Sequence, residues 1–325
     1  MVRKVLIILV LVIFSQVSFA TESFGNRPEV QAFIKHMVKK YKFNESYLIV
    51  LFNSVKVRPT VIKSIQAPLE INPWHKYQML FVTEWRIRQG VAFWNKYQDA
   101  LTKAEKIYGI PAKIIVATIG VETKYGQNNG NYKVIDALTN IGFSKNPRAH
   151  YFRQELEEFL LLAREQHIDP LKIYGSYAGA IGQPQFMPSN YRSYAVNFSG
   201  SGTIDLSHNQ VDVIGSIANY YKKHGWKDNQ PVAIPATVTG YHYTKLLASN
   251  KALPLSDFTD LGIYPRGYAN EDLKAKLIEL KGSYRNEYWL GFHNFDVIKR
   301  YNTSTLYAMA VYQLSEYIDA VRGRS

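Results

Sequence analysis

The sequence contains no cysteine, and this absence excludes several classes of protein. The count of Cys is 0 in 325 residues. Disulfide bonds, thiolate zinc sites, iron–sulfur clusters and a cysteine nucleophile are therefore excluded. A lipid attached to an N-terminal cysteine is excluded for the same reason. The length still suffices for a sizeable hydrophobic core.

Acidic residues are fewer than basic ones. Asp and Glu total 26 against 39 Lys and Arg, which gives a formal net charge of +13. Such a chain is suited to nucleic acid, an anionic membrane surface or an acidic cell-wall polymer. Long Lys/Arg runs, zinc fingers and other nucleic-acid motifs are missing, so we expect no nucleic-acid partner. A loose association with a membrane surface fits the charge, and so does an ordinary solvated surface.

Long apolar runs are also missing, except at the N-terminus. Val5 to Phe14 is apolar, follows the basic pair Arg3-Lys4 and precedes the small-residue pattern that ends at Ala20. This order predicts a secretory signal peptide over residues 1–20. The apolar run is short for a transmembrane helix, and an uncleaved anchor is the alternative. We expect an exported, periplasmic protein without lipidation.

Apolar residues recur every three or four positions through most of the remaining chain, which predicts a mainly helical protein. The expected helices span residues 28–41, 84–108, 112–124, 149–167, 210–224 and 305–321. Residues 232–238 and the segment before Arg285 have the pattern of short strands and loops. The predicted fold class is mainly α (α+β) with a small β-containing insertion.

Glu122 is the first candidate for catalysis. It follows an apolar helical segment, and Thr118, Ile119 and Ile115 share its face of the helix. Burial of a carboxylate is costly, so desolvation would raise its pKa and keep it protonated near neutral pH. A general acid for glycosidic cleavage needs this property. A helix-end Glu that reaches solvent or pairs with Lys124 is the alternative.

Two longer motifs resemble a known family. They read IGVETKYG at residues 119–126 and GSYAGAIGQPQFMPSNY at residues 175–191. Together with segments at residues 73–77, 211–226 and 295–302, they closely resemble the membrane-bound lytic murein transglycosylase B family. The resemblance covers nearly the whole chain after residue 20.

The resemblance implies a lysozyme-like core that acts on peptidoglycan glycan strands. It also implies that residues 21–325 form the catalytic region. Within that region we expect a helical lobe at about 21–108, the lysozyme-like core at about 109–228, a small mixed β subdomain at about 229–295, and a C-terminal cleft segment and helix at about 296–325.

The same resemblance assigns individual residues. Glu122 matches the family's single acid/base, which cuts the β-1,4 bond between N-acetylmuramic acid and N-acetylglucosamine and leaves a 1,6-anhydromuramoyl end. The matching substrate-binding positions are Ser176, Gln185, Tyr77, Tyr301 and Asn302. Ser176 could instead cap its loop, Gln185 could satisfy loop backbone, and the tyrosines could be ordinary packing residues. Pro184 stands where the family commonly has glycine, which puts backbone contacts at this position in question.

A second motif resembles the family's EF-hand-like calcium loop. Its matching ligand positions are Asn197, Ser199, Ser201, Thr203 and Asp212. Asn197 and Ser201 stand where the family prefers Asp, so two negative charges are missing from the ligand set. We expect no required cofactor and at most weak calcium binding.

Two other functions are compatible with this fold. A catalytically silent peptidoglycan-binding scaffold would have no need of an acid on an apolar helix face. A muramidase-type hydrolase would need a second carboxylate that positions a water, and the recognised motifs supply none. The sequence therefore favours a lytic transglycosylase.

Overall fold

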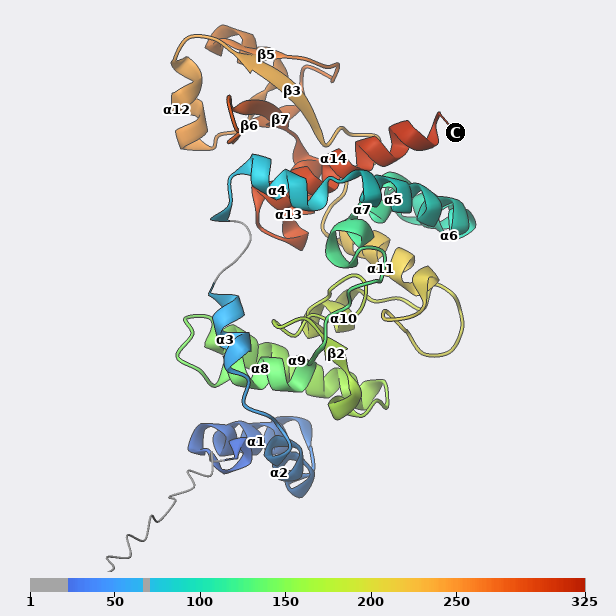
Figure 1. Cartoon of the computed structure of the whole chain (residues 1–325), viewed down its shortest axis with the longest axis vertical. Coiled ribbons are helices and arrows are strands. Elements are labelled where there is room, and N and C mark those ends of the chain that lie inside the picture. Colours follow the sequence, from blue (N-terminus) through green and yellow to red (C-terminus); the bar gives the residue numbers. More distant parts are fainter. Residues whose placement is uncertain (1–22, 67–70, 325) are drawn as a thin grey trace, which may run out of the picture. The chain divides into compact units, whose positions relative to one another are not determined.

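The computed structural model describes residues 23–66 and 71–324 (Figure 1). The chain divides into two compact units, one that ends at Val55 and one that begins at Lys56. The predicted signal peptide lies outside the described residues. No helix in the described part of the chain is long and apolar enough to cross a membrane.

The first unit is a small helical body. It contains the short 3-10 helix η1 (Phe24–Asn26), α1 (Pro28–Tyr41) and α2 (Glu45–Asn53). Pro28 opens α1, where its missing N–H costs nothing. The Asn44 side chain caps α2 by accepting from the backbone N–H of Tyr47. Phe33 and Phe52 meet edge to face in its core, with ring centroids 5.9 Å apart.

The second unit contains the remaining helices. They are α3 (Pro59–Ile65), α4 (Trp74–Phe81), α5 (Glu84–Lys96), α6 (Gln98–Tyr108), α7 (Ala112–Thr123), α8 (Val134–Gly142), α9 (Ala149–Glu165), η3 (Pro170–Lys172), α10 (Pro188–Tyr194), α11 (Gln210–Lys223), α12 (His242–Ser249), η4 (Leu255–Leu261), α13 (His293–Tyr301) and α14 (Thr305–Arg322). The strongly periodic segments of the sequence are helical, so the mainly helical prediction is confirmed.

The single helix predicted over residues 84–108 is wrong. The structure has two helices there, α5 and α6, and they are separated at Tyr97. Tyr97 leaves helical backbone geometry, with φ −115° and ψ 27°. Its ring packs on Phe93, with centroids 4.7 Å apart. Both helices keep an apolar face toward the core, so apolar residues recur every three or four positions on both sides of Tyr97. The hydrophobic pattern therefore does not reveal the break.

A five-stranded antiparallel sheet forms the small β-containing part. Its strands are β3 (Ala233–Val238), β4 (Leu253–Pro254), β5 (Ile263–Pro265), β6 (Lys274–Leu280) and β7 (Glu287–Gly291), in the order β4-β6-β7-β3-β5. The expected strands at residues 232–238 and before Arg285 correspond to β3 and β6. Phe258, Leu290 and Phe292 are at most 2% exposed and anchor a core between the sheet, η4 and α12.

Helix α7 lies at the centre of the helical part and packs against α5, α6, α11 and α14. Two glycines permit this packing. A Cβ on Gly120 would lie 2.5 Å from the Tyr125 hydroxyl, and a Cβ on Gly90 of α5 would lie 2.7 Å from the same atom. The Tyr125 hydroxyl occupies that space and donates to the Arg86 carbonyl at 2.7 Å. The end of α7 is thereby fixed against α5.

Candidate active site

Glu122 lies in the last turn of α7. Every other residue from Ile114 to Thr123 is buried, whereas Glu122 is half-buried. The helix ends directly after it because Lys124, Tyr125 and Gly126 all adopt positive φ, between 53° and 85°. The chain turns away at this point, and the carboxylate is left at the wall of a cavity.

This cavity has a volume of about 620 Å³. Aromatic rings and neutral polar groups dominate its wall, with two basic residues, Arg86 and Lys124. Glu122 is the one carboxylate among the described residues that line it. The described lining comprises Tyr77, Leu80, Phe81, Arg86, Val121, Glu122, Lys124, Asn128, Gly130, Asn131, Tyr132, Ser176, Tyr177, Gln185, Asn302 and Tyr307.

Tyr307 is a hydrogen-bond partner of Glu122. Its hydroxyl donates to Glu122 Oε1 at 2.6 Å. Burial raises the pKa of Tyr307 well above its usual value, and the nearby charge of Glu122 raises it further. The phenol therefore stays protonated and acts as a fixed donor. Tyr307 could not be identified from the sequence, because it occupies one more apolar position of the last helix.

Ser176 lies in the same cavity, in the loop that follows β2 (Tyr174–Gly175). Its hydroxyl oxygen accepts from the backbone N–H groups of Ala178 at 3.3 Å and Ala180 at 3.0 Å. These bonds match the loop-cap alternative. Its role in orienting Glu122 stays a prediction.

Gln185 is held in a strained turn beside Glu122. Its backbone has φ 51°, which is uncommon for a residue with a side chain. The backbone amides of Ile181 and Phe186 donate to each other's carbonyls and close the turn at 2.8 and 3.1 Å. Gln185 Nε2 donates to the carbonyls of Gly182 and Asn129. The side chain thus satisfies loop backbone while lining the cavity.

The remaining predicted binding residues differ in position. Tyr77 is 1% exposed and its ring packs on Phe81, yet it contributes to the cavity wall. Asn302 also lines the cavity, and its Oδ1 accepts from Ser304 N at 3.1 Å. Tyr301 is not among the lining residues. Its hydroxyl donates to the carbonyl of Pro184 at 2.6 Å, so the proline position keeps a backbone contact.

Tyr301 instead belongs to an aromatic cluster next to the carboxylate. Its ring stacks on Tyr307 with 14° between the planes and also contacts Tyr220 and Tyr221. Burial raises the pKa of Tyr301, and the charge of Glu122 is the second cause. These buried rings make the surroundings of Tyr301 and Tyr307 less polar than water, which strengthens their electrostatic interaction with Glu122.

The predicted calcium loop is closed by its own hydrogen bonds. Asp212 is fully buried, and its two carboxylate oxygens accept from Ser199 N at 2.9 Å and Asp205 N at 3.2 Å. The Asn197 side chain donates to the Gly202 carbonyl at 2.7 Å. Thr203 takes part in none of these bonds and lies at the wall of a second cavity.

The Asn209 amide occupies the ligand side of this loop. Its Nδ2 donates to Ser199 Oγ at 3.0 Å and Ser201 Oγ at 3.4 Å, and the two serine hydroxyls share a 2.7 Å bond. Its Oδ1 caps α11 through Val211 N. Within residues 23–66 and 71–324, no group of three or more His, Asp or Glu side chains could hold a metal ion. Asp212 is the one carboxylate among the five matching positions, and its oxygens and the two serine hydroxyls already accept hydrogen bonds within the loop, so the residues present fit a calcium site poorly.

Comparison with known proteins agrees with this geometry. The family described as Transglycosylase SLT domain matches residues 25–316. Membrane-bound lytic murein transglycosylase B of Escherichia coli K12 is 40% identical over 309 residues, which span 92% of this chain and 85% of that protein.

Solved structures give the same result at the level of the fold. Lytic transglycosylase SltB1 of Pseudomonas aeruginosa is 43% identical, with a TM-score of 0.84, over 92% of this chain and 99% of that one. Lytic transglycosylase Slt35 of Escherichia coli, solved in complex with calcium, is 40% identical with a TM-score of 0.83, over 92% and 95% of the two chains. Since the match runs through the helix of Glu122, the loop of Ser176 and the segment of Asn302, the chain belongs to the Transglycosylase SLT family of lytic transglycosylases.

Proposed function

We propose that the chain cleaves the β-1,4 bond between N-acetylmuramic acid and N-acetylglucosamine in peptidoglycan and forms 1,6-anhydromuramoyl ends. Glu122 is the group that transfers protons. The main support for this proposal is that Glu122 is the one carboxylate among the described residues that line its cavity. A hydrolase with two carboxylates places the second one where it can activate a water or attack the sugar.

In the first step, protonated Glu122 gives its proton to the oxygen of the leaving N-acetylglucosamine as the bond to C1 breaks. Tyr307 holds Oε1 by a hydrogen bond, which orients the carboxyl group at the wall of the cavity. The acetamido carbonyl of the muramoyl residue stabilises C1 on the face that the leaving group does not occupy. Tyr132 and Tyr177 supply ring faces on which sugars can stack, whereas Tyr77 supports the wall from behind.

In the second step, the muramoyl C6 hydroxyl attacks C1 and gives its proton to the Glu122 carboxylate. The acid is thereby regenerated and no water is consumed. Tyr307 donates a hydrogen bond in both states, and this bond favours the ionised carboxylate that receives the proton. One titratable group is enough because the two proton transfers occur in opposite directions.

The test is the chemistry of the product. Digestion of purified sacculi should release muropeptides that are lighter by one water than lysozyme products and unreactive to borohydride. In oxygen-18 water, the new muramoyl end should carry no label. Reducing, labelled ends would assign a hydrolase on the same fold. Tight binding to sacculi without any soluble product would assign the silent scaffold.

We further propose a periplasmic location and peptidoglycan glycan strands as the partner. The relatives are named as murein-degrading enzymes, and the basic N-terminal segment fits export. No cofactor is needed for the two steps. The loop at Asp212 holds its shape through the Asn209 amide, and we assign it no metal.

A further inference from the structure

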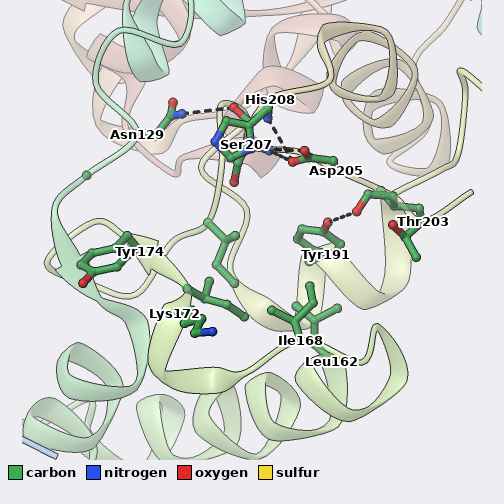
Figure 2. Close-up of a pocket in the computed structure, with 14 residues that line it drawn as sticks. Asn129, Leu162, Ile168, Lys172, Tyr174, Tyr191, Thr203, Asp205, Ser207 and His208 are labelled. Atoms are coloured by element: carbon green, nitrogen blue, oxygen red, sulfur yellow. Dashed lines mark hydrogen bonds and ion pairs between the residues drawn. The ribbon is translucent and has the colours of Figure 1, made fainter. Parts of the chain in front are cut away.

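A second cavity lies beside the catalytic one and has a volume of about 580 Å³ (Figure 2). It opens between the end of α9, η3, β2 and the loop of residues 203–208. Buried Leu162, Ile181 and Tyr191 supply apolar surface. The Tyr191 hydroxyl donates to the Ile204 carbonyl at 2.9 Å, which fixes that side of the wall.

The backbone at Gly130 borders both cavities. Gly130 carries no side chain, and a Cβ there would lie 2.1 Å from the Gly175 carbonyl oxygen. β1 (Tyr132–Lys133) and β2 extend this boundary, with Tyr132 in the catalytic cavity and Tyr174 in the second one. A branch of a substrate bound in the first cavity therefore has a pocket close by.

The charges around the second cavity are of both signs and lie apart. Figure 2 shows Lys172 on the margin opposite to Asp205 and His208. The Asp205 carboxylate accepts from the backbone N–H of Ser207 and His208 and lies 3.2 Å from His208 Nδ1, so its position is fixed. Lys172 is exposed and forms no ion pair with any described residue. A ligand with a carboxylate at one end and an ammonium group at the other is complementary to this arrangement.

We infer that the second cavity binds the peptide stem of peptidoglycan. The inference rests on the proposed function, because the stem is the branch that the muramoyl residue carries. Lys172 pairs with a stem carboxylate, Asp205 faces the ammonium group of the diamino acid, and the apolar wall receives the alkyl portions. A further stretch of glycan would have no ionic group for Lys172 to pair with.

Direct binding tests this inference without turnover. The full chain carrying Glu122→Gln is titrated with the free tripeptide L-alanyl-γ-D-glutamyl-meso-diaminopimelate. We expect saturable binding that Lys172→Met weakens about two- to fivefold, as for an exposed ion pair. Lys245→Met, an exposed lysine on α12 outside both cavities, is the matched control and should change nothing. The Glu122→Gln chain should bind a tripeptide with amidated carboxyl groups more weakly than the free tripeptide. The further change Lys172→Met should not weaken binding of this amidated tripeptide.

Kinetics then separates the stem from the glycan. On intact sacculi, Lys172→Met should raise the apparent KM by the same factor and leave kcat unchanged. On glycan strands stripped of peptides by an amidase, it should have no effect. Equal losses on both substrates would make the cavity a glycan subsite, and no loss on either would overturn the inference. If the parent chain made no anhydro products but still bound the tripeptide, the proposed function would fail and the stem site would stand.

Discussion

Glu122 and Asp212 are both carboxylates within the helical core, and their surroundings differ in kind. Asp212 is fully buried and accepts two backbone N–H bonds, from Ser199 and Asp205. Glu122 accepts from a phenol and faces a cavity of about 620 Å³. Backbone donors on both oxygens fix the position of a buried carboxylate in its loop, whereas a carboxylate at a cavity wall can contact a ligand. Burial of an acid is therefore weak evidence for catalysis until its partners are known.

The largest expected effect comes from removing the exchangeable proton. Glu122→Gln is isosteric but can neither give nor accept the proton, so activity on sacculi should fall below a few percent. Melting temperature and circular dichroism should match the parent chain. Asp212→Asn is the matched control, since it makes the same chemical change at the other carboxylate. It should keep kcat and lose about 1–3 kcal/mol in free energy of unfolding. Full activity in a folded Glu122→Gln chain would contradict the assigned role.

A smaller effect is expected from Tyr307→Phe, which removes the hydrogen bond to Glu122 Oε1 and keeps the ring. A hydrogen bond to a charged group contributes about 1.5–3 kcal/mol, so kcat should fall by about one to two orders of magnitude. The lost hydrogen bond favoured the ionised carboxylate, so its removal should raise the pKa of Glu122. The first step needs the protonated form, which then persists to higher pH. The alkaline limb of the kcat profile should therefore move to higher pH.

A purely structural role for Tyr307 would lower the melting temperature and leave the pH profile in place. Tyr301→Phe serves as the control for loss of a buried hydroxyl, because that hydroxyl donates to Pro184 and not to Glu122. The pH dependence of kcat for Tyr301→Phe should have the same midpoints as that of the unsubstituted chain.

The smallest effect concerns calcium at the Asp212 loop. Millimolar calcium added to chelated protein should leave the melting temperature within experimental error. A ligand that bound only the native state at a hundredfold excess over its Kd would add about 2.7 kcal/mol. Asn209→Ala removes the amide from the loop and should lower stability, again without a calcium response. A rise in melting temperature on adding calcium, without a similar rise on adding magnesium, would show a functional metal site.

The sequence predicted the parts of the site that local patterns encode. Glu122 on an apolar helix face and the motif around Ser176 were visible without any structure. Tyr307 was not, because its partner lies 185 positions earlier in the chain and hydrophobic periodicity carries no information about such pairs. Asn209 was missed for a related reason. Asn209 caps the N-terminus of α11 and also donates to the serine hydroxyls of the preceding loop, but in the sequence it looks like an ordinary N-cap.

The same distinction explains the errors in the fold. Long amphipathic helices were predicted nearly to their ends, whereas the break at Tyr97 leaves the apolar period intact. Helix α8 is buried along its whole length, and its polar residues Asp136 and Asn140 accept from the backbone of Lys56 and Arg58, about 80 positions earlier in the chain. Local sequence patterns carry no information about such distant partners.

The contact between Gly120 and Tyr125 restricts how this protein can be engineered. Replacing a helical glycine with alanine is a common route to higher stability, with a gain of up to about 1 kcal/mol in helix propensity. At Gly120 the added methyl would lie 2.5 Å from the Tyr125 hydroxyl, two positions before Glu122. Relief of that overlap would move the turn that ends α7. Thermostabilisation is better directed at exposed positions remote from both cavities, such as those of α12.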